Sequence, residues 1–231
     1  MMLFHWSHKK IDYYRRAGEY TGFFAKLLSL LLPLFDADDE VADLGSGLGL
    51  FDLLLAPHVR HIDAIDEHPA AIADLEAEIR ERGIGNIDTT VASVENLAEH
   101  EWDVIFMSFF GLAAGDLTAM LKRARKRVII VTHNDDKARR GKNAYSKRRL
   151  SNATAIADYI DGEGIEYQRF DYLMDFGHPL KSLEDAEHFA DCDTHGSRKS
   201  AMHSELIAIK DGDYAYFVPK DKNISVFVID T

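Results

Sequence analysis

Short apolar runs alternate with amphipathic segments through the middle of the chain. Five of the runs have the length and the β-branched content of buried strands: VADLG, HIDAID, IDTTV, WDVIFMS and RVIIVT. The segments LFDLLLA, PAAIADLEAEIRER and GDLTAMLKRARK lie between them and have the spacing of helices. Strands that alternate with helices are typical of a parallel sheet covered by helices. The pattern therefore predicts an α/β fold between Val41 and Thr132.

The C-terminal half continues this pattern less regularly. After Thr132 we expect a polar loop, a helix over residues 146–161 and a sixth strand near IEYQRFDYL. Residues 182–210 are predicted to form one or two helices, and the chain finishes with the extended segments DYAYFV and NISVFVID. No repeat or low-complexity linker interrupts the 231 residues, which favours a single domain. We divide it into four segments: an N-terminal helical cover (1–35), a core (36–172), a helical insertion (173–212) and C-terminal strands (213–231).

Composition and charge restrict the location and the partners. The apolar segment FFAKLLSLLLPLF is too short to span about 30 Å of hydrocarbon and contains Lys26, so we expect a buried amphipathic helix. The chain carries 27 basic and 39 acidic residues, and a net charge of −12 disfavours a general binder of DNA or anionic membranes. Cys192 is the single cysteine, which favours a reducing compartment. We predict a cytoplasmic protein with no membrane contact.

The turn after the first predicted strand is rich in glycine. In VADLGSGLG, Asp43 precedes Gly45, Gly47 and Gly49, which occupy alternate positions. A turn without Cβ atoms lets a ligand approach the main chain, and the helix that follows offers free N–H groups. A dinucleotide-binding turn of the form G-x-G-x-x-G would need a glycine at position 50, which is leucine.

An apolar strand that carries an acid and runs into G-x-G-x-G resembles the first motif of class I S-adenosylmethionine-dependent methyltransferases. The resemblance covers residues 20–135 and implies a Rossmann-like, mostly parallel seven-stranded sheet. The implied strand order is 3-2-1-4-5-7-6, with an antiparallel last strand and helices on both faces. The implied cofactor is S-adenosyl-L-methionine, with S-adenosyl-L-homocysteine as the product. Gly45, Ser46 and Gly47 would run along its methionine part, and Asp43 would attract the methionine ammonium.

The same resemblance assigns the acid at the end of the second predicted strand to the ribose. In the family such a carboxylate accepts hydrogen bonds from both ribose hydroxyls, and Asp66 ends the strand HIDAID. Asp63 is a competing acid in mid-strand, and Asp66 has an alternative role as a cap of the next helix. Glu67 and Gly49 complete this part of the predicted cofactor contacts.

The adenine contacts depart from the family pattern. Family members often carry an Asp after the third strand, where this chain has Ser93. We expect Ser93 or a backbone carbonyl to hold adenine, with apolar contact from Val94 and Leu48.

The fourth predicted strand, in WDVIFMSFFG, resembles the one whose end faces the transferred methyl group. It lacks an Asn-Pro-Pro-Tyr-like motif and has no cysteine nearby, which argues against an exocyclic-amine methyltransferase of DNA and against attack on a pyrimidine ring. Met107 is predicted to contact the cofactor, and Phe109 and Phe110 to contact the substrate. The aromatic pair has an equally good interpretation as core residues.

Two further groups are candidates for the acceptor side. His133 follows the fifth strand, has a pKa suited to a general base, and is otherwise a surface residue of a loop. The N-terminal segment holds Tyr14, predicted to contact the cofactor, and Trp6 and Tyr20, predicted to contact the substrate. The alternative for these three rings is packing of the cover.

Basic residues concentrate between positions 122 and 149, opposed there only by Asp135 and Asp136. The loop 137–149 is either a guide for RNA or a solvated segment that balances an acidic body. In the insertion, His188, Cys192 and His195 suggest zinc, but the paired ligand spacing of a structural site is missing, so we predict no metal.

Three functions follow from these features. The first is methyl transfer to a small-molecule acceptor, which the acidic charge favours. The second is an RNA or protein methyltransferase that uses the basic loop, and the third is a non-catalytic protein that binds S-adenosylmethionine.

Overall fold

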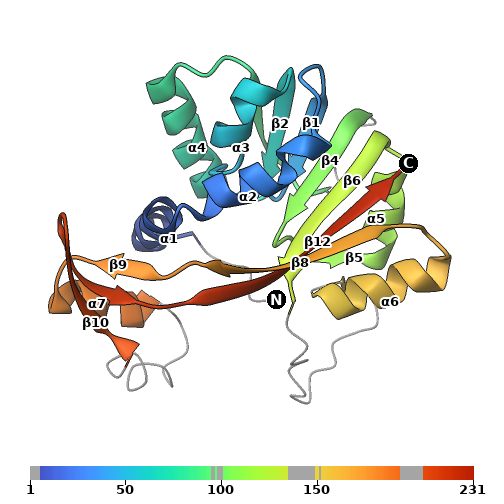
Figure 1. The fold of residues 1–231 in the computed structure, drawn as a ribbon. Helices are drawn as coiled ribbons and strands as arrows, with labels where there is room; N and C mark the ends of the chain where they lie inside the picture. Colours follow the sequence, from blue (N-terminus) through green and yellow to red (C-terminus); the bar gives the residue numbers. More distant parts are fainter. Residues whose placement is uncertain (1–5, 95–96, 98–100, 135–148, 151, 193–204) are drawn as a thin grey trace. The chain divides into compact units, whose positions relative to one another are not determined.

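The computed structural model describes residues 6–94, 97, 101–134, 149–150, 152–192 and 205–231. Seven strands form its main sheet in the order β3-β2-β1-β4-β6-β12-β8 (Figure 1). Numbered along the chain, this order reads 3-2-1-4-5-7-6, which confirms the predicted topology. The bounds are Glu40–Leu44 (β1), His61–Asp66 (β2), Ile87–Val91 (β3), Trp102–Ser108 (β4), Ala124–His133 (β6), Gln168–Asp175 (β8) and Asp221–Asp230 (β12).

The sheet is parallel from β3 to β6 and antiparallel between β6 and β12. Val41 on β1 pairs with Ile62 on β2 and with Val104 on β4, so β1 lies inside the sheet. Because parallel strands present their carboxyl ends at one edge, the residues that follow β1, β2, β4 and β6 line the same edge. This edge carries the predicted site residues of the sheet.

The remaining strands are short. β5 (Leu112–Ala113) pairs with β7 (Arg149–Leu150), and a three-stranded sheet has the order β10-β11-β9. The bounds of the three strands are His178–Leu180 (β9), Ile207–Asp211 (β10) and Tyr214–Val218 (β11).

Seven α-helices accompany the strands in the described part of the chain. They are α1 (His8–Thr21), α2 (Phe23–Leu31), α3 (Asp52–Leu55), α4 (Pro69–Arg82), α5 (Ala114–Leu121), α6 (Ala153–Glu163) and α7 (Leu183–Cys192). Short 3-10 helices follow α2 at Leu32–Leu34 and α3 at Ala56–His58. None of the described helices is long and apolar enough to cross a membrane.

Helix α4 forms where local signals predict it. Pro69 occupies its first turn, where a missing N–H costs nothing, and Gly83 ends it with φ of 66°. Ile72 and Leu75 are buried three positions apart on one face. The predicted bounds of this helix are confirmed.

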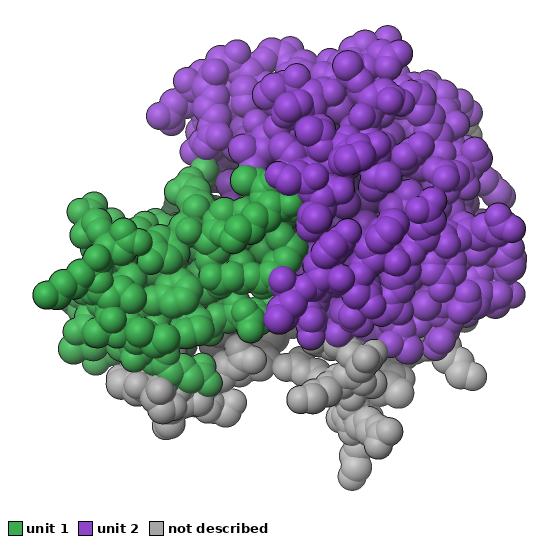
Figure 2. All heavy atoms as spheres, viewed as in Figure 1, with its two compact units in different colours: residues 1–27, 174–222 green, residues 28–173, 223–231 purple. Residues whose placement is uncertain are grey.

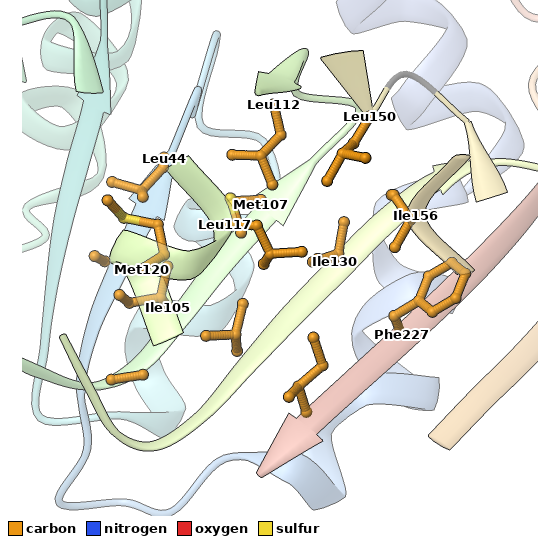
Figure 3. Packing of buried hydrophobic residues seen from close by; sticks show 14 of the residues in the cluster. Leu44, Ile105, Met107, Leu112, Leu117, Met120, Ile130, Leu150, Ile156 and Phe227 are labelled. Atoms are coloured by element: carbon orange, nitrogen blue, oxygen red, sulfur yellow. The ribbon is translucent and has the colours of Figure 1, made fainter. Parts of the chain in front are cut away.

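One core cluster lies between a face of the sheet and helices α5 and α6 (Figure 3). Its members are mostly buried aliphatic and sulfur side chains, with two aromatic residues, Trp102 and Phe227. Among the others are Leu44, Ile105, Met107, Leu117, Met120, Ile130 and Ile156. Phe106 alternates with these positions and therefore faces the other side, where it stacks on Phe51 with ring centroids 4.5 Å apart. Packing on both faces holds the strand ends that carry the site.

The chain divides into two compact units, which Figure 2 shows in different colours. The sheet unit consists of residues 28–173 and 223–231, and the accessory unit of residues 1–27 and 174–222. The accessory unit thus takes most of the predicted cover and the predicted insertion. The proposed segmentation of the chain into cover, core, insertion and C-terminal strands stays a prediction.

Side chains from distant parts of the chain hold the accessory unit together. The Tyr13 hydroxyl donates to Asp185 Oδ1 at 2.8 Å, and Arg16 Nη1 donates to Asp185 Oδ2 at 2.8 Å. Burial raises the pKa of Asp185, but the bonds from Arg16, a backbone N–H and Tyr13 outweigh it, and the net pKa is lowered. Phe189 on α7 packs on Tyr13 with centroids 5.1 Å apart.

Four expectations about element bounds need correction. The helix predicted over residues 115–126 ends at Leu121, because Ala124 begins β6 and pairs with Trp102. The helix predicted over 146–161 begins at Ala153, where the Asn152 side chain accepts from a backbone N–H; residues 146–148 lie outside the described part.

The sixth strand begins three residues later than predicted, at Gln168. Residues 207–210, predicted as helix, form part of β10 because they pair with β11. Within α7, Ala186 and Phe189 face inward as expected, whereas Leu183 is 55% exposed at the helix start.

Candidate functional site

The glycine turn joins β1 to α3 with a backbone that only glycine adopts easily. Gly45, Gly47 and Gly49 have φ of 80°, 55° and 58°. A Cβ on Gly45 would lie 2.3 Å from the Phe110 ring, and one on Gly49 would lie 2.4 Å from Leu75. The glycines are therefore required by the turn and by packing, independently of any ligand.

Asp66 fastens the end of β2 to this turn. Its Oδ2 accepts the Gly47 N–H at 2.9 Å, and its Oδ1 accepts the His68 N–H at 2.8 Å and lies 2.9 Å from His68 Nδ1. The carboxylate is thus buried, ordered and placed beside the glycine turn. His68 is the residue before α4, so Asp66 also satisfies an N–H at the helix start.

Three side chains around the turn have buried polar atoms that no donor reaches. Asp43 Oδ1, Ser46 Oγ and both carboxyl oxygens of Asp52 receive no hydrogen bond from an N–H or O–H donor of the other described residues. Asp43 is 3% exposed and Asp52 is 0% exposed. Unpaired buried oxygens are costly, and a set of them marks a place for a donor.

The pKa values of the two acids reflect this environment. Burial raises the pKa of Asp43 well above its ordinary value, and the charges of Asp52 and Asp66 raise it further. Burial also raises the pKa of Asp52, against a contact with Asp43 that acts in the other direction. Sequence reasoning missed Asp52, although an acid inside the apolar run LFDLLLA is a signal of a buried polar role.

The other predicted cofactor residues lie along the same sheet. Ser93 and Val94 follow β3 and are half-buried, and Glu67 is exposed after β2. Leu48 is 2% exposed inside the turn, and Met107 is 1% exposed within the core cluster. Their contacts with a cofactor stay predictions.

Phe109 is strained at the end of β4. Its φ of 53° lies in the left-handed region, which no other non-glycine residue of the described chain occupies. The Phe109 N–H donates to Val131 O at 2.8 Å, and its ring lies 4.7 Å from the exposed His133 ring between centroids. Strain of this kind concentrates at functional sites, so the Phe109–His133 pair is a candidate wall on the acceptor side. Phe110 packs against the core cluster and over Gly45.

The predicted aromatic contacts of the N-terminal segment belong to the accessory unit. Tyr14 packs against Trp6 and Phe176, with centroids 5.4 and 5.1 Å away. Tyr20 packs against Tyr214 and Phe217 in the same unit. These rings therefore fill the packing role that was the alternative, and their contacts with cofactor or substrate stay predictions.

Two other candidate groups are only partly described. His188 and Cys192 both lie on α7, whereas His195 and the loop residues 137–148 lie outside the described residues. His61 lies between Asp63 (3.3 Å) and the largely exposed Asp88 (3.6 Å) at the start of β2, away from the glycine turn. This group lies at the opposite end of the strand from Asp66.

The basic residues of β6 form ion pairs with acidic side chains. Arg125 pairs with Asp103 and Glu40, Lys126 with Asp36 and Asp39, and Arg127 with Asp230. The hydrogen bonds that Arg125 donates to Asp103 and Glu40 raise the pKa of Arg125 above its ordinary value. The three cations lie near the start of β6, at the amino edge of the sheet, whereas the glycine turn lies at the carboxyl edge.

Comparison with known proteins agrees with the strand order and the glycine turn described above. Residues 41–125 match a family model described as a methyltransferase domain. The YcgJ protein from Bacillus subtilis is similar in structure, with a TM-score of 0.57 and 15% identity over 88% of this chain and 98% of that chain. No curated protein matches the chain in sequence.

Two further solved structures are similar. The magnesium protoporphyrin IX methyltransferase from Synechocystis PCC 6803, solved with bound SAM, has a TM-score of 0.56 and 11% identity over 95% of this chain and 91% of that chain. A putative RNA methyltransferase from Pyrococcus horikoshii has a TM-score of 0.54 and 14% identity over 91% and 84%. At these identities the likeness shows a shared fold.

Proposed function

We propose that this chain is a class I S-adenosylmethionine-dependent methyltransferase that methylates a small-molecule acceptor. The proposal is supported by the match of residues 41–125 to a family model described as a methyltransferase domain. When bound, the cofactor would supply a methyl group from its sulfonium: a bond from the acceptor atom to the methyl carbon would form in line as the carbon–sulfur bond breaks, with S-adenosylhomocysteine as the leaving group. The protein has to bind and orient the two reactants, exclude water and, for a protonated acceptor, remove a proton.

The residues around the glycine turn fit this cofactor. The methionine ammonium has three N–H donors, and the buried oxygens of Asp43 and Ser46 lack donors among the described residues. Asp66 provides carboxyl oxygens at the end of β2 that can accept hydrogen bonds from the ribose hydroxyls, beside the turn whose Gly47 N–H it already accepts. In this proposal Asp43 attracts the ammonium and Asp66 orients the sugar.

The ion pairs of β6 are the observation that supports a small acceptor over RNA. A protein that binds a phosphate backbone needs cations free to replace counterions. Arg125, Lys126 and Arg127 instead form ion pairs with acids of the sheet unit, at the edge away from the glycine turn. The basic loop 137–149 remains the feature of the sequence that would favour an RNA or protein acceptor.

His133 is the proposed general base, with Phe109 as the ring that orients it. The two rings lie against each other at the ends of β6 and β4, where an acceptor would meet the methyl group. Replacing His133 by Asn should lower turnover about 10²-fold while cofactor affinity is unchanged. Unchanged turnover would remove His133 from the reaction and leave the rest of the proposal standing.

Fractionated cell extract and methyl-labelled S-adenosylmethionine test the acceptor class. We expect label in the low-mass fraction, strongly reduced by Asp66→Asn and unaffected by the matched control Asp88→Asn. Label in RNA that disappears after Arg139→Ala with Arg140→Ala would overturn the proposal in favour of an RNA methyltransferase. Cofactor binding without transfer to any fraction would favour a non-catalytic binder.

A further inference from the structure

Two carboxyl groups lie buried together at the glycine turn. Asp43 is on β1, and Asp52 is the first residue of α3, directly after the turn. Neither carboxyl is more than 3% exposed by residue. The two carboxyl groups lie within hydrogen-bonding reach of each other, and no N–H or O–H of another described residue donates to Oδ1 of Asp43 or to either oxygen of Asp52.

No described cation neutralises this pair. The ion pairs of the sheet unit engage other acids, such as Asp39 with Lys126 and Asp103 with Arg125. The remaining charged group that acts on Asp43 is Asp66, which is itself an acid. Two buried carboxylates without a counter-charge cannot both be ionised at low cost, because like charges in a poorly solvated site repel.

We propose that Asp43 and Asp52 share one proton in the free protein and release it to solvent when the methionine ammonium of the cofactor binds. This inference rests on the proposed function and adds Asp52 as a second residue of the ammonium pocket. The balance is simple: a singly protonated pair and an ammonium become a doubly ionised pair beside an ammonium, plus one proton. The incoming positive charge makes ionisation of the second carboxyl favourable.

The consequence is that cofactor affinity depends on pH. Below the pH at which the pair ionises by itself, binding has to expel a proton, so affinity falls as pH falls. Between pH 5.5 and 7.0 we expect the affinity of the wild-type protein to rise about threefold or more. The α-amino group of the ligand stays protonated in this range, since its pKa is about 7.7–8.0.

Calorimetry with S-adenosylhomocysteine measures the proton directly. Titrations at pH 6.5 in three buffers with different ionisation enthalpies give the number of protons released per ligand bound. We expect a release approaching one proton for the wild-type protein, and little or none for Asp52→Asn. Asp52→Ser serves as a second variant, and Asp88→Asn is the matched control that should behave as wild type.

The outcomes separate the two proposals. Binding without proton release in the wild-type protein would overturn the shared proton and leave the proposed function standing. Full release from both folded Asp52 variants would overturn the role of Asp52. Absence of binding to both S-adenosylhomocysteine and S-adenosylmethionine would overturn the proposed function itself, and this inference with it.

Discussion

The sheet unit and the accessory unit are each stabilised internally by a different kind of interaction. In the sheet unit, aliphatic side chains such as Ile105 and Val128 are fully buried on strands that lie side by side. In the accessory unit, rings and ion pairs join residues far apart in the chain, as between Tyr13 and Asp185. The first unit depends on close packing, and the second on a few polar and aromatic contacts. Each should therefore fail under a different kind of substitution.

The largest effect is expected from a cavity in the sheet unit. Phe106 is fully buried and stacks on Phe51, so Phe106→Ala should lower the free energy of unfolding by about 3–5 kcal/mol. Denaturant unfolding followed by circular dichroism measures this loss. Leu30→Ala, at a position 40% exposed, is the control and should change little. A loss similar to that of the control would show that the sheet core is loosely packed.

A smaller and more local effect is expected from the accessory unit. Asp185→Ala leaves the buried Arg16 with the exposed Asp12 as its remaining acidic partner among the described residues, and should cost about 2–4 kcal/mol. Hydrogen exchange should lose protection in α1 and α7 while β4 and β6 keep theirs. Equal loss in β4 and β6 would contradict the independence of the two units.

The ion pair between Arg16 and Asp185 makes the stability of the accessory unit depend on pH. The pKa of Asp185 is lowered in the folded protein, so its contribution is present above the unfolded pKa near 3.9. It is lost as the pH falls below that value. Protection of α7 should therefore fall at acid pH in the wild-type protein and show no such pH dependence in Asp185→Ala.

A stabilising change is expected at the acid pair of the sheet unit. The folded protein disfavours ionised Asp52, whose pKa is raised, whereas the unfolded chain ionises freely above about pH 4. Asp52→Asn should therefore raise the free energy of unfolding by about 1–2 kcal/mol at pH 7.5, with the difference shrinking toward pH 4. Urea titrations at both pH values measure it. A difference independent of pH would point to packing instead of charge.

The smallest effect is expected at the surface ion pairs of β6. The Arg125 side chain is 41% exposed, so Arg125→Ala should cost less than about 1 kcal/mol and less still at high salt. Retention on immobilised RNA should not change, because Arg125 bonds Glu40 and Asp103. Reduced retention would assign the β6 cations to a nucleic-acid surface.

The elements of the sheet unit could be predicted because their signals are local. Pro69 and Gly83 delimit α4 by their own backbone preferences, and alternating buried positions define β4 and β6. Prediction from the sequence was wrong where the secondary structure of a residue depends on a partner elsewhere in the chain. Ala124 joins β6 instead of extending α5, because Trp102 offers it a strand to pair with.

The candidate cofactor site shows the same contrast between what the sequence predicts and what it misses. The sequence by itself determined the turn, since G-x-G-x-G after an apolar strand specifies a backbone with positive φ, and it placed Asp66 at the end of the next strand. Only the tertiary structure decided that Asp52 lies buried with Asp43. The same holds for the Phe110 ring, which covers Gly45, and for the hydrogen bond that Arg16 donates to Asp185. Backbone geometry is set by neighbours along the chain, whereas burial and charge pairing are set by neighbours in space.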